Sequence, residues 1–132
     1  RVAFCGACGS DAAECACAWT GGAPPELPLV PGHEIVGMVE EAPGDAPAWA
    51  ARGAWVGVGC MVASCGSCRR CSRGEEQFCN RVAWTYGSRL DDDGEGACSD
   101  ASGDKPAARA RTTGGFATHV VADVRFLVPL PE

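Results

Sequence analysis

The chain has 132 residues, a length that suits one domain and is too short for a catalytic domain together with a complete cofactor-binding domain. Its 11 Lys and Arg against 17 Asp and Glu give a net charge of -6, which argues against a partner with a phosphate backbone such as nucleic acid. The 18 Gly and 9 Pro predict short strands joined by many turns, with few long helices.

Five short segments rich in apolar residues predict strands, and no segment has the three-to-four periodicity of an amphipathic helix. The first strand runs into the turn-rich residues 8–11, and Gly37 in the second strand marks a bulge or a close backbone approach. In chain order the expected strands are residues 2–5, 35–40, 54–59, 114–122 and 125–130.

Residues 87–111 have many Asp, Gly and Ser and little to bury, so we expect a solvated and flexible insertion. Asp91, Asp93 and Glu95 alternate as calcium ligands do, but the longer ligand series of an EF-hand loop is missing. Cys98 within this insertion is expected to be a free thiol.

No apolar run approaches the roughly 20 residues of a membrane span, and the first residues lack the apolar core of a signal peptide. We therefore expect no membrane association and a cytoplasmic location, where zinc thiolates persist and disulfides usually do not.

The strongest chemical signal is a cluster of four cysteines with the spacing C-x2-C-x2-C-x7-C, in a lobe that we expect to span residues 60–80. Its members are Cys65, Cys68, Cys71 and Cys79. Four thiolates match the closed tetrahedral shell of a structural zinc, and Arg69, Arg70 and Arg73 can moderate their charge. The x7 spacing favours zinc, and an iron–sulfur cluster or disulfides are the alternatives.

A second and weaker group combines Cys8 and Asp11 with His33 and Glu34. Cys, His and carboxylate are the ligand types of a catalytic zinc, which keeps one position open for water or substrate. A lone Cys and a lone His are more often core or surface residues, so composition alone leaves this site open. His119 is expected to be a surface or strand residue.

These motifs, in this order, resemble the catalytic domain of zinc-dependent medium-chain alcohol dehydrogenases, and most closely its cinnamyl alcohol dehydrogenase-like branch. The resemblance covers nearly the whole chain except residues 87–111. It implies a mainly β, GroES-like, partly open β-barrel over residues 1–132. The motifs are Cys5-Gly-Ala-Cys-Gly-Ser-Asp11, Pro28-Leu-Val-Pro-Gly-His-Glu-Ile-Val-Gly37, Val56-Gly-Val-Gly-Cys60, the cysteine cluster, Thr85-Tyr86 and Gly114-Gly-Phe-Ala117.

Carried over residue by residue, the resemblance implies that Cys8 and His33 are two of the three protein ligands of a catalytic zinc, with Glu34 as the adjacent carboxylate. It implies that Asp11 orients the ligand His33, and that Ser10 hydrogen-bonds the substrate oxygen and starts a proton relay. In the family, zinc acts as a Lewis acid on the alcohol oxygen, and the hydride passes to a nicotinamide. The four clustered cysteines match the structural-zinc lobe of the family.

The chain also departs from the family pattern. The third catalytic-zinc ligand of the family, a Cys, and its Rossmann domain lie beyond Glu132, so we expect no cofactor-binding residues here. Gly9 and Ala13 stand where the branch usually has histidines, one near the cofactor phosphates and one at the end of the relay. Gly53-Ala54 stands where Gly-Asp is typical, so a turn hydrogen bond is expected to be missing.

We therefore predict the catalytic-domain part of a zinc-dependent, NADP-linked alcohol dehydrogenase or aldehyde reductase that acts on a small alcohol or aldehyde. Trp19 is expected to line the substrate pocket. The 132 residues alone are expected to bind zinc without turnover, and a homodimer is expected only for the full-length protein. The alternative is a non-enzymatic zinc-binding module that lacks a cofactor domain.

Overall fold

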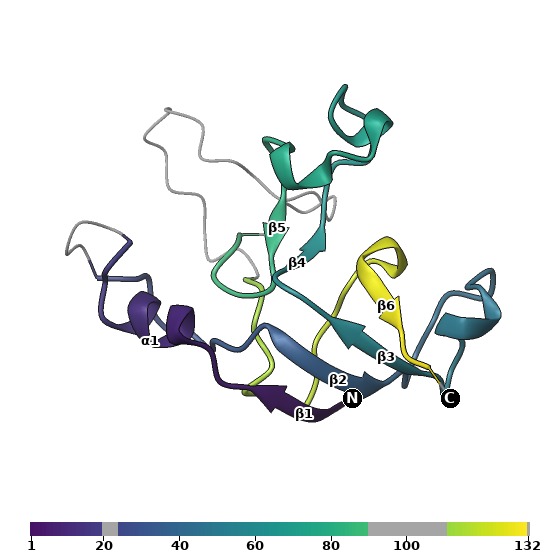
Figure 1. Cartoon of the computed structure of the whole chain (residues 1–132), viewed down its shortest axis with the longest axis horizontal. Helices are drawn as coiled ribbons and strands as arrows, with labels where there is room; N and C mark the ends of the chain where they lie inside the picture. The colour runs from purple at the N-terminus through teal and green to yellow at the C-terminus, as the bar shows by residue number, and fades with distance from the viewer. Residues whose placement is uncertain (20–23, 90–110, 132) are drawn as a thin grey trace.

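The computed structural model describes residues 1–19, 24–89 and 111–131. An antiparallel sheet in the order β1-β2-β3-β6 forms the main layer, and β4 and β5 form a second, two-stranded sheet (Figure 1). The strands are β1 (Val2–Gly6), β2 (Glu34–Met38), β3 (Trp55–Val58), β4 (Met61–Ala63), β5 (Ala83–Trp84) and β6 (Leu127–Pro129). The helical elements are α1 (Gly9–Cys15) and four 3-10 turns, η1 (Ala48–Ala50), η2 (Cys71–Arg73), η3 (Glu76–Phe78) and η4 (Val124–Phe126). The mainly β class predicted from the sequence is confirmed.

Strand register gives the four-stranded sheet one buried face and one open face. Ile35 pairs with Val58, and Gly37 pairs with Val56, so these side chains share the buried face. The alternate positions carry large apolar side chains that are about half exposed or more. They are Phe4, Trp55 and Val128. The sheet therefore has a packed inner face and an apolar outer face.

The core is small and joins the two sheets on the buried face of the larger one. Its buried members are Ile35, Val58, Val62 and Ala83. Partly buried side chains from other elements pack around them, among them Val2, Cys5, Val120, Ala122 and Leu127. Because β4 and β5 contribute one core residue each, the lobe that they support is anchored to the main sheet.

Gly37 shows the close backbone approach that the sequence predicts. A Cβ at this position would lie 2.5 Å from the carbonyl oxygen of Arg1. The Met38 amide donates to that same carbonyl at 2.9 Å, and the register of β1 shifts between Val2 and Phe4 opposite this point. A side chain at Gly37 would therefore separate β1 from β2.

Helix α1 corrects the prediction that residues 8–11 form only a loop. Its first turn is closed by Asp11, whose Oδ2 accepts the Cys8 amide at 3.0 Å. Asp11 is also the one buried residue of the seven-residue helix. The helix has no apolar stripe, so hydrophobic periodicity carried no signal for it.

The predicted strand over residues 114–122 is also wrong, because this segment crosses several neighbours instead of pairing with one. The amides of Gly114, Gly115 and Phe116 donate to carbonyls of residues 30–32, at 2.7 to 3.1 Å. The Thr118 carbonyl then accepts the amide of Val2 at 2.9 Å. Val120 and Ala122 of this segment pack against the core from an irregular backbone.

Replacing Gly114 with Ala is expected to lower the free energy of unfolding by about 1–3 kcal/mol, the range typical of overpacking. A Cβ at Gly114 would lie 2.4 Å from the carbonyl oxygen of Gly32 and 2.5 Å from that of Pro31, both backbone atoms. Gly44→Ala is the control, because a Cβ there meets nothing within 4 Å. Urea unfolding measures both, and equal stabilities of the two variants would contradict this account.

Strands β4 and β5 were not predicted, because three and two residues are too short to show an alternating pattern. Residues 90–110 of the predicted insertion, with Cys98, lie outside the described residues. Arg89 and Arg111 form a single antiparallel bridge at its base, and both guanidinium groups bind the carboxylate of Glu26. Within the described ranges, no helix has the length and apolar character needed to cross a membrane.

Candidate active site and metal centres

The four clustered cysteines bring their sulfur atoms together at the end of the lobe. Cys65 and Cys68 follow β4, Cys71 opens η2, and Cys79 follows η3. The sulfur of Cys65 lies 3.5 Å from that of Cys79 and 3.9 Å from that of Cys71. The sulfur of Cys68 lies 3.6 Å from that of Cys71 and 3.9 Å from that of Cys79.

These separations fit one metal ion. A tetrahedral zinc with sulfur ligands at about 2.3 Å requires sulfur atoms about 3.8 Å apart. An iron–sulfur cluster places several iron atoms between its thiolates and therefore needs wider spacing. The nine cysteines of the described residues are all free thiols. The lobe therefore has the ligand geometry of a single structural metal.

Hydrogen bonds prepare two thiols of this cluster, Cys65 and Cys71, to become thiolates. Backbone amides of Ser67 and Cys68 lower the pKa of Cys65 to about 6. A hydrogen bond with Ser64, whose hydroxyl oxygen lies 3.4 Å from the Cys71 sulfur, lowers the pKa of Cys71. Burial raises the pKa of Cys79 to about 11, although the Arg81 amide donates to its sulfur at 3.3 Å. Metal binding would release the protons that remain.

The second group is assembled by the pairing of β1 with β2. Gly6 at the end of β1 lies opposite Glu34 at the start of β2, so the residues just outside the ladder converge. Cys8, His33 and Glu34 place one ligand atom each within 4.8 Å of one another. Cys8 and His33 are half-buried and Glu34 is exposed, which leaves the group open on one side.

Asp11 is the buried centre of this group. Its carboxylate accepts the amides of Cys8 and Gly32 at 3.0 Å each, and lies 3.1 Å from Nδ1 of His33. Burial alone would raise the pKa of Asp11, but hydrogen bonds from these two amides, from Tyr86 and from His33 lower it. Asp11 is therefore an anion that fixes the start of α1 and the His33 ring together.

The hydrogen bond to Asp11 selects the tautomer of His33. Because Asp11 only accepts, we infer that Nδ1 carries the proton and that Nε2 keeps its lone pair. Nε2 lies 3.3 Å from the hydroxyl oxygen of Ser10. His33 thus presents a metal-binding nitrogen toward Ser10 and the open side of the group.

A cavity of about 700 Å³ opens beside this group. Ser10 and His33 line one part of it, and aromatic side chains, including the expected Trp19, line much of the rest. The full lining is Ser10, Glu14, Trp19, His33, Cys60, Trp84, Thr85, Tyr86, Gly87 and Ser88. Its size and mixture of aromatic and polar groups suit a small organic molecule.

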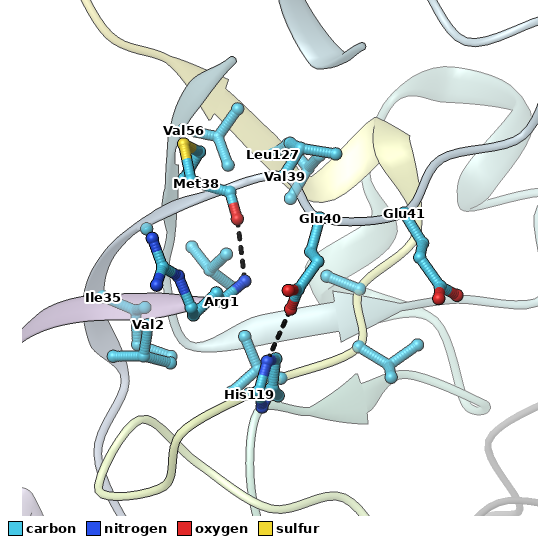
Figure 2. Close-up of a pocket in the computed structure, with 15 residues that line it drawn as sticks. Arg1, Val2, Ile35, Met38, Val39, Glu40, Glu41, Val56, His119 and Leu127 are labelled. Atoms are coloured by element: carbon cyan, nitrogen blue, oxygen red, sulfur yellow. Dashed lines mark hydrogen bonds and ion pairs between the residues drawn. The ribbon is translucent and has the colours of Figure 1, made fainter. Parts of the chain in front are cut away.

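A second cavity, of about 510 Å³, lies under the opposite end of the main sheet (Figure 2). His119 lines it and, as expected, is an exposed surface residue, with Nε2 2.6 Å from a Glu40 carboxylate oxygen. The Glu40 pKa is lowered by this bond. None of the predicted site residues lines this second cavity.

Residues 1–132 match the family described as the alcohol dehydrogenase GroES-like domain. The chain belongs to this family. The GroES-like fold and the family resemblance predicted from the motifs are both confirmed.

Related proteins share a third or more of the aligned residues with this GroES-like domain. A probable cinnamyl alcohol dehydrogenase 2 of Picea abies is 36% identical over 132 residues, which are 100% of this chain and 31% of that protein. Cinnamyl alcohol dehydrogenase 1 of Ocimum basilicum is 41% identical over 105 residues, 80% of this chain and 25% of that protein. A probable formaldehyde dehydrogenase of Bacillus subtilis is 39% identical over 132 residues, 99% of this chain and 32% of that protein.

Solved structures show the same fold. A cinnamyl alcohol dehydrogenase of Sorghum bicolor superposes with a TM-score of 0.76 at 32% identity, covering 100% of this chain and 32% of that one. The CAD of Helicobacter pylori, complexed with NADP(H), superposes with a TM-score of 0.74 at 29% identity, covering 98% of this chain and 32% of that one. The GroES-like domain described here therefore spans about a third of the length of these relatives.

Tyr86 is a site residue of this GroES-like domain whose role the sequence did not reveal. Its hydroxyl hydrogen-bonds Asp11, and its ring is tilted against the His33 ring with the centroids 5.9 Å apart. Burial, followed by the bond to Asp11, raises the Tyr86 pKa to about 12, so the hydroxyl stays a donor. Tyr86 is far from Asp11 and His33 along the chain, so no sequence spacing indicated that the three side chains meet.

Proposed function

We propose that this GroES-like domain is the catalytic part of a zinc-dependent, NADP-linked alcohol dehydrogenase that interconverts small aldehydes and primary alcohols. The observation that carries the proposal is the convergence of Cys8 and Glu34 with His33, which also lines the aromatic-lined cavity. Relatives named cinnamyl alcohol dehydrogenase and a related structure with NADP(H) support the reaction class and the cofactor.

Zinc fits both groups of ligands. In the lobe, Cys65, Cys68, Cys71 and Cys79 would hold a structural ion. Beside the cavity, which His33 lines, Cys8 and His33 would hold the catalytic ion, with Glu34 next to them. The catalytic zinc would supply Lewis-acid chemistry at the substrate oxygen.

The residues of the chain itself then have separate tasks. Asp11 holds His33 in the tautomer whose Nε2 faces the cavity. Ser10, next to that nitrogen, hydrogen-bonds the substrate oxygen and exchanges its proton. Ala13 offers no titratable group for a longer relay, so we expect this proton to exchange with water in the cavity.

The test is NADPH-dependent reduction of cinnamaldehyde and of simple aliphatic aldehydes by the full-length protein. Cys8→Ser and His33→Ala are expected to lower turnover on the order of a hundredfold or more, because each removes a metal ligand. Cys15→Ser is the matched control, since Cys15 is an exposed thiol outside both groups. Unchanged turnover in Cys8→Ser and His33→Ala would refute the assignment of the site.

The 132-residue chain by itself is expected to bind zinc without transferring hydride. Its described residues form only antiparallel strand pairs and contain no parallel sheet with a glycine-rich turn for a dinucleotide. Turnover by this chain would contradict the division of tasks proposed here. A zinc-loaded full-length protein inactive toward every aldehyde would favour the alternative, a zinc-binding module without enzymatic activity.

A further inference from the structure

Asp123 and Arg125 form a rigid pair where η4 meets the lobe. The Asp123 amide donates to the Val62 carbonyl of β4 at 2.8 Å, which fixes the start of η4 against that strand. The Asp123 carboxylate accepts the Arg125 amide at 2.9 Å, Nε at 3.1 Å and Nη2 at 2.7 Å. The guanidinium is therefore held in one orientation by both backbone and side-chain bonds.

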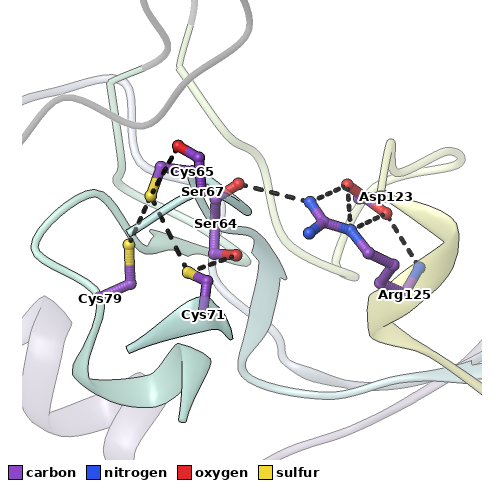
Figure 3. A network of polar contacts seen from close by, with 7 residues as sticks. All are labelled: Ser64, Cys65, Ser67, Cys71, Cys79, Asp123 and Arg125. Carbon is purple, nitrogen blue, oxygen red and sulfur yellow. Dashed lines mark hydrogen bonds and ion pairs between the residues drawn. The ribbon is translucent and has the colours of Figure 1, made fainter. Parts of the chain in front are cut away.

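Held in this way, the Arg125 guanidinium lies over the turn that carries Cys65 (Figure 3). Nη2 lies 3.5 Å from the Ser64 carbonyl oxygen, and Nη1 lies 2.8 Å from where a Cβ of Gly66 would be. The Ser64 hydroxyl also lies 3.4 Å from the Cys71 sulfur. Arg125 thus contacts the residues on both sides of one cysteine and the hydrogen-bond partner of a second.

The charge of a four-thiolate zinc centre also favours a role for Arg125. Zn²⁺ with four thiolates carries a net charge of -2, which needs nearby positive groups. The Arg70 guanidinium is engaged elsewhere, 3.1 Å from a Glu75 oxygen and 5.8 Å from the centre of the Phe78 ring. Arg69 and Arg73 are exposed. Arg125 is also exposed, with 47% of its side chain accessible, but Asp123 fixes its guanidinium against the cysteine-bearing backbone.

We propose that Arg125 is a positioning residue for the zinc lobe, oriented by Asp123. It holds the 64–66 turn in the geometry that directs Cys65 inward, and its charge stabilises the anionic centre. Metal retention by the lobe therefore depends on the η4 segment, more than 40 residues beyond the last cysteine of the cluster. The inference rests on the proposed structural zinc.

The experiment measures zinc release from the 132-residue chain to a chromogenic chelator, after a mild chelator has removed weakly bound metal. Arg125→Gln is expected to release the lobe zinc about tenfold faster, the scale typical of residues that support metal ligands. Arg125→Lys keeps the positive charge but loses the planar set of guanidinium N–H donors, so an intermediate rate of zinc release is expected. Arg69→Gln removes the same charge from an exposed position of the lobe and should release zinc at the wild-type rate.

Further measurements separate positioning from a general loss of stability. Asp123→Asn should also speed release, and the double variant with Arg125→Gln should add little, because both changes disrupt one contact. In these variants the free energy of unfolding of the metal-free chain should change less than the activation free energy of zinc release from the loaded chain. Substitution of the zinc with cobalt should give the absorption bands of a metal bound by four thiolates.

The outcomes are distinguishable. A wild-type chain that holds no tightly bound zinc would overturn the proposed structural zinc. If the wild-type chain holds zinc, two results would overturn only the role of Arg125. One is release from Arg125→Gln at the wild-type rate, and the other is release from Arg69→Gln as fast as from Arg125→Gln. Should Arg125→Gln fail to fold, the comparison of Arg125→Lys with wild type decides in the same way.

Discussion

Replacing Cys65 with Ser is expected to abolish tight zinc binding by the lobe and to unfold the part of the lobe that follows β4, residues 64–80. The lobe has little apolar core of its own, since Val62 of β4 belongs to the main core and the buried side chains after β4 are Ser64, Cys71 and Cys79. Metal binding must therefore supply its folding free energy, which in zinc-finger peptides amounts to about 10–16 kcal/mol. We expect about one tightly bound zinc per wild-type chain and none in this variant, with amide hydrogen exchange of the lobe becoming fast.

Cys60→Ser is the matched control, because Cys60 is an exposed cysteine at the start of the lobe and outside the cluster. A graded chelator series adds a second comparison. A mild chelator should strip metal held by Cys8 and His33 and leave the lobe loaded, since two ligands and a carboxylate bind zinc more weakly than four thiolates. Tight zinc in Cys65→Ser, or loss of both metals together, would contradict the assignment.

The strands that were predicted correctly are those in which local composition and burial agree. Ile35 and Val36 in β2, and Val56 and Val58 in β3, are β-branched residues interspersed with Gly, and Ile35 pairs directly with Val58. Gly37 could be interpreted in advance because a glycine inside such a run marks close approach of another backbone. In these segments the local pattern is sufficient.

The errors occur where a single polar contact or a tertiary crossing decides the structure. Helix α1 depends on Asp11 closing its first turn, and a buried carboxylate does not register as helical periodicity. Residues 114–122 have the β-branched composition of a strand, yet their amides bond to the backbone of residues 30–32. Such crossings are set by the whole fold and have no local signature.

The candidate sites divide in the same way. The spacing of the four clustered cysteines is local, so the convergence of their sulfur atoms could be predicted, and zinc binding by them stays a prediction. Cys8 and His33 are 25 residues apart and needed the family motifs to be linked. Tyr86 and Arg125 reach their partners across the fold, so only the structure could assign them.

Replacing Asp11 with Asn is expected to weaken metal binding at the Cys8 and His33 site by about 10–100-fold, the usual effect of losing a group that orients a ligand. The carboxylate accepts hydrogen bonds from Cys8, Gly32, His33 and Tyr86, all of which are donors. The amide group of Asn presents two N–H donors to the same neighbours, so at least one buried donor must lose its partner. Stability should therefore fall as well, by about 1–3 kcal/mol for each donor left unpaired.

Asp45→Asn is the control for Asp11→Asn, because it makes the same chemical change at an exposed loop position. Competition titration with a zinc indicator measures the weak site, and urea unfolding of the chain with only the lobe loaded measures stability. The lobe should keep its zinc in both variants, since Asp11 lies outside the cysteine cluster. A neutral amide oxygen bonds Nδ1 of His33 more weakly than a carboxylate does, so Nε2 is held less firmly toward Ser10. Wild-type affinity in Asp11→Asn, or loss of lobe zinc with it, would show that Asp11 does not orient the ligand.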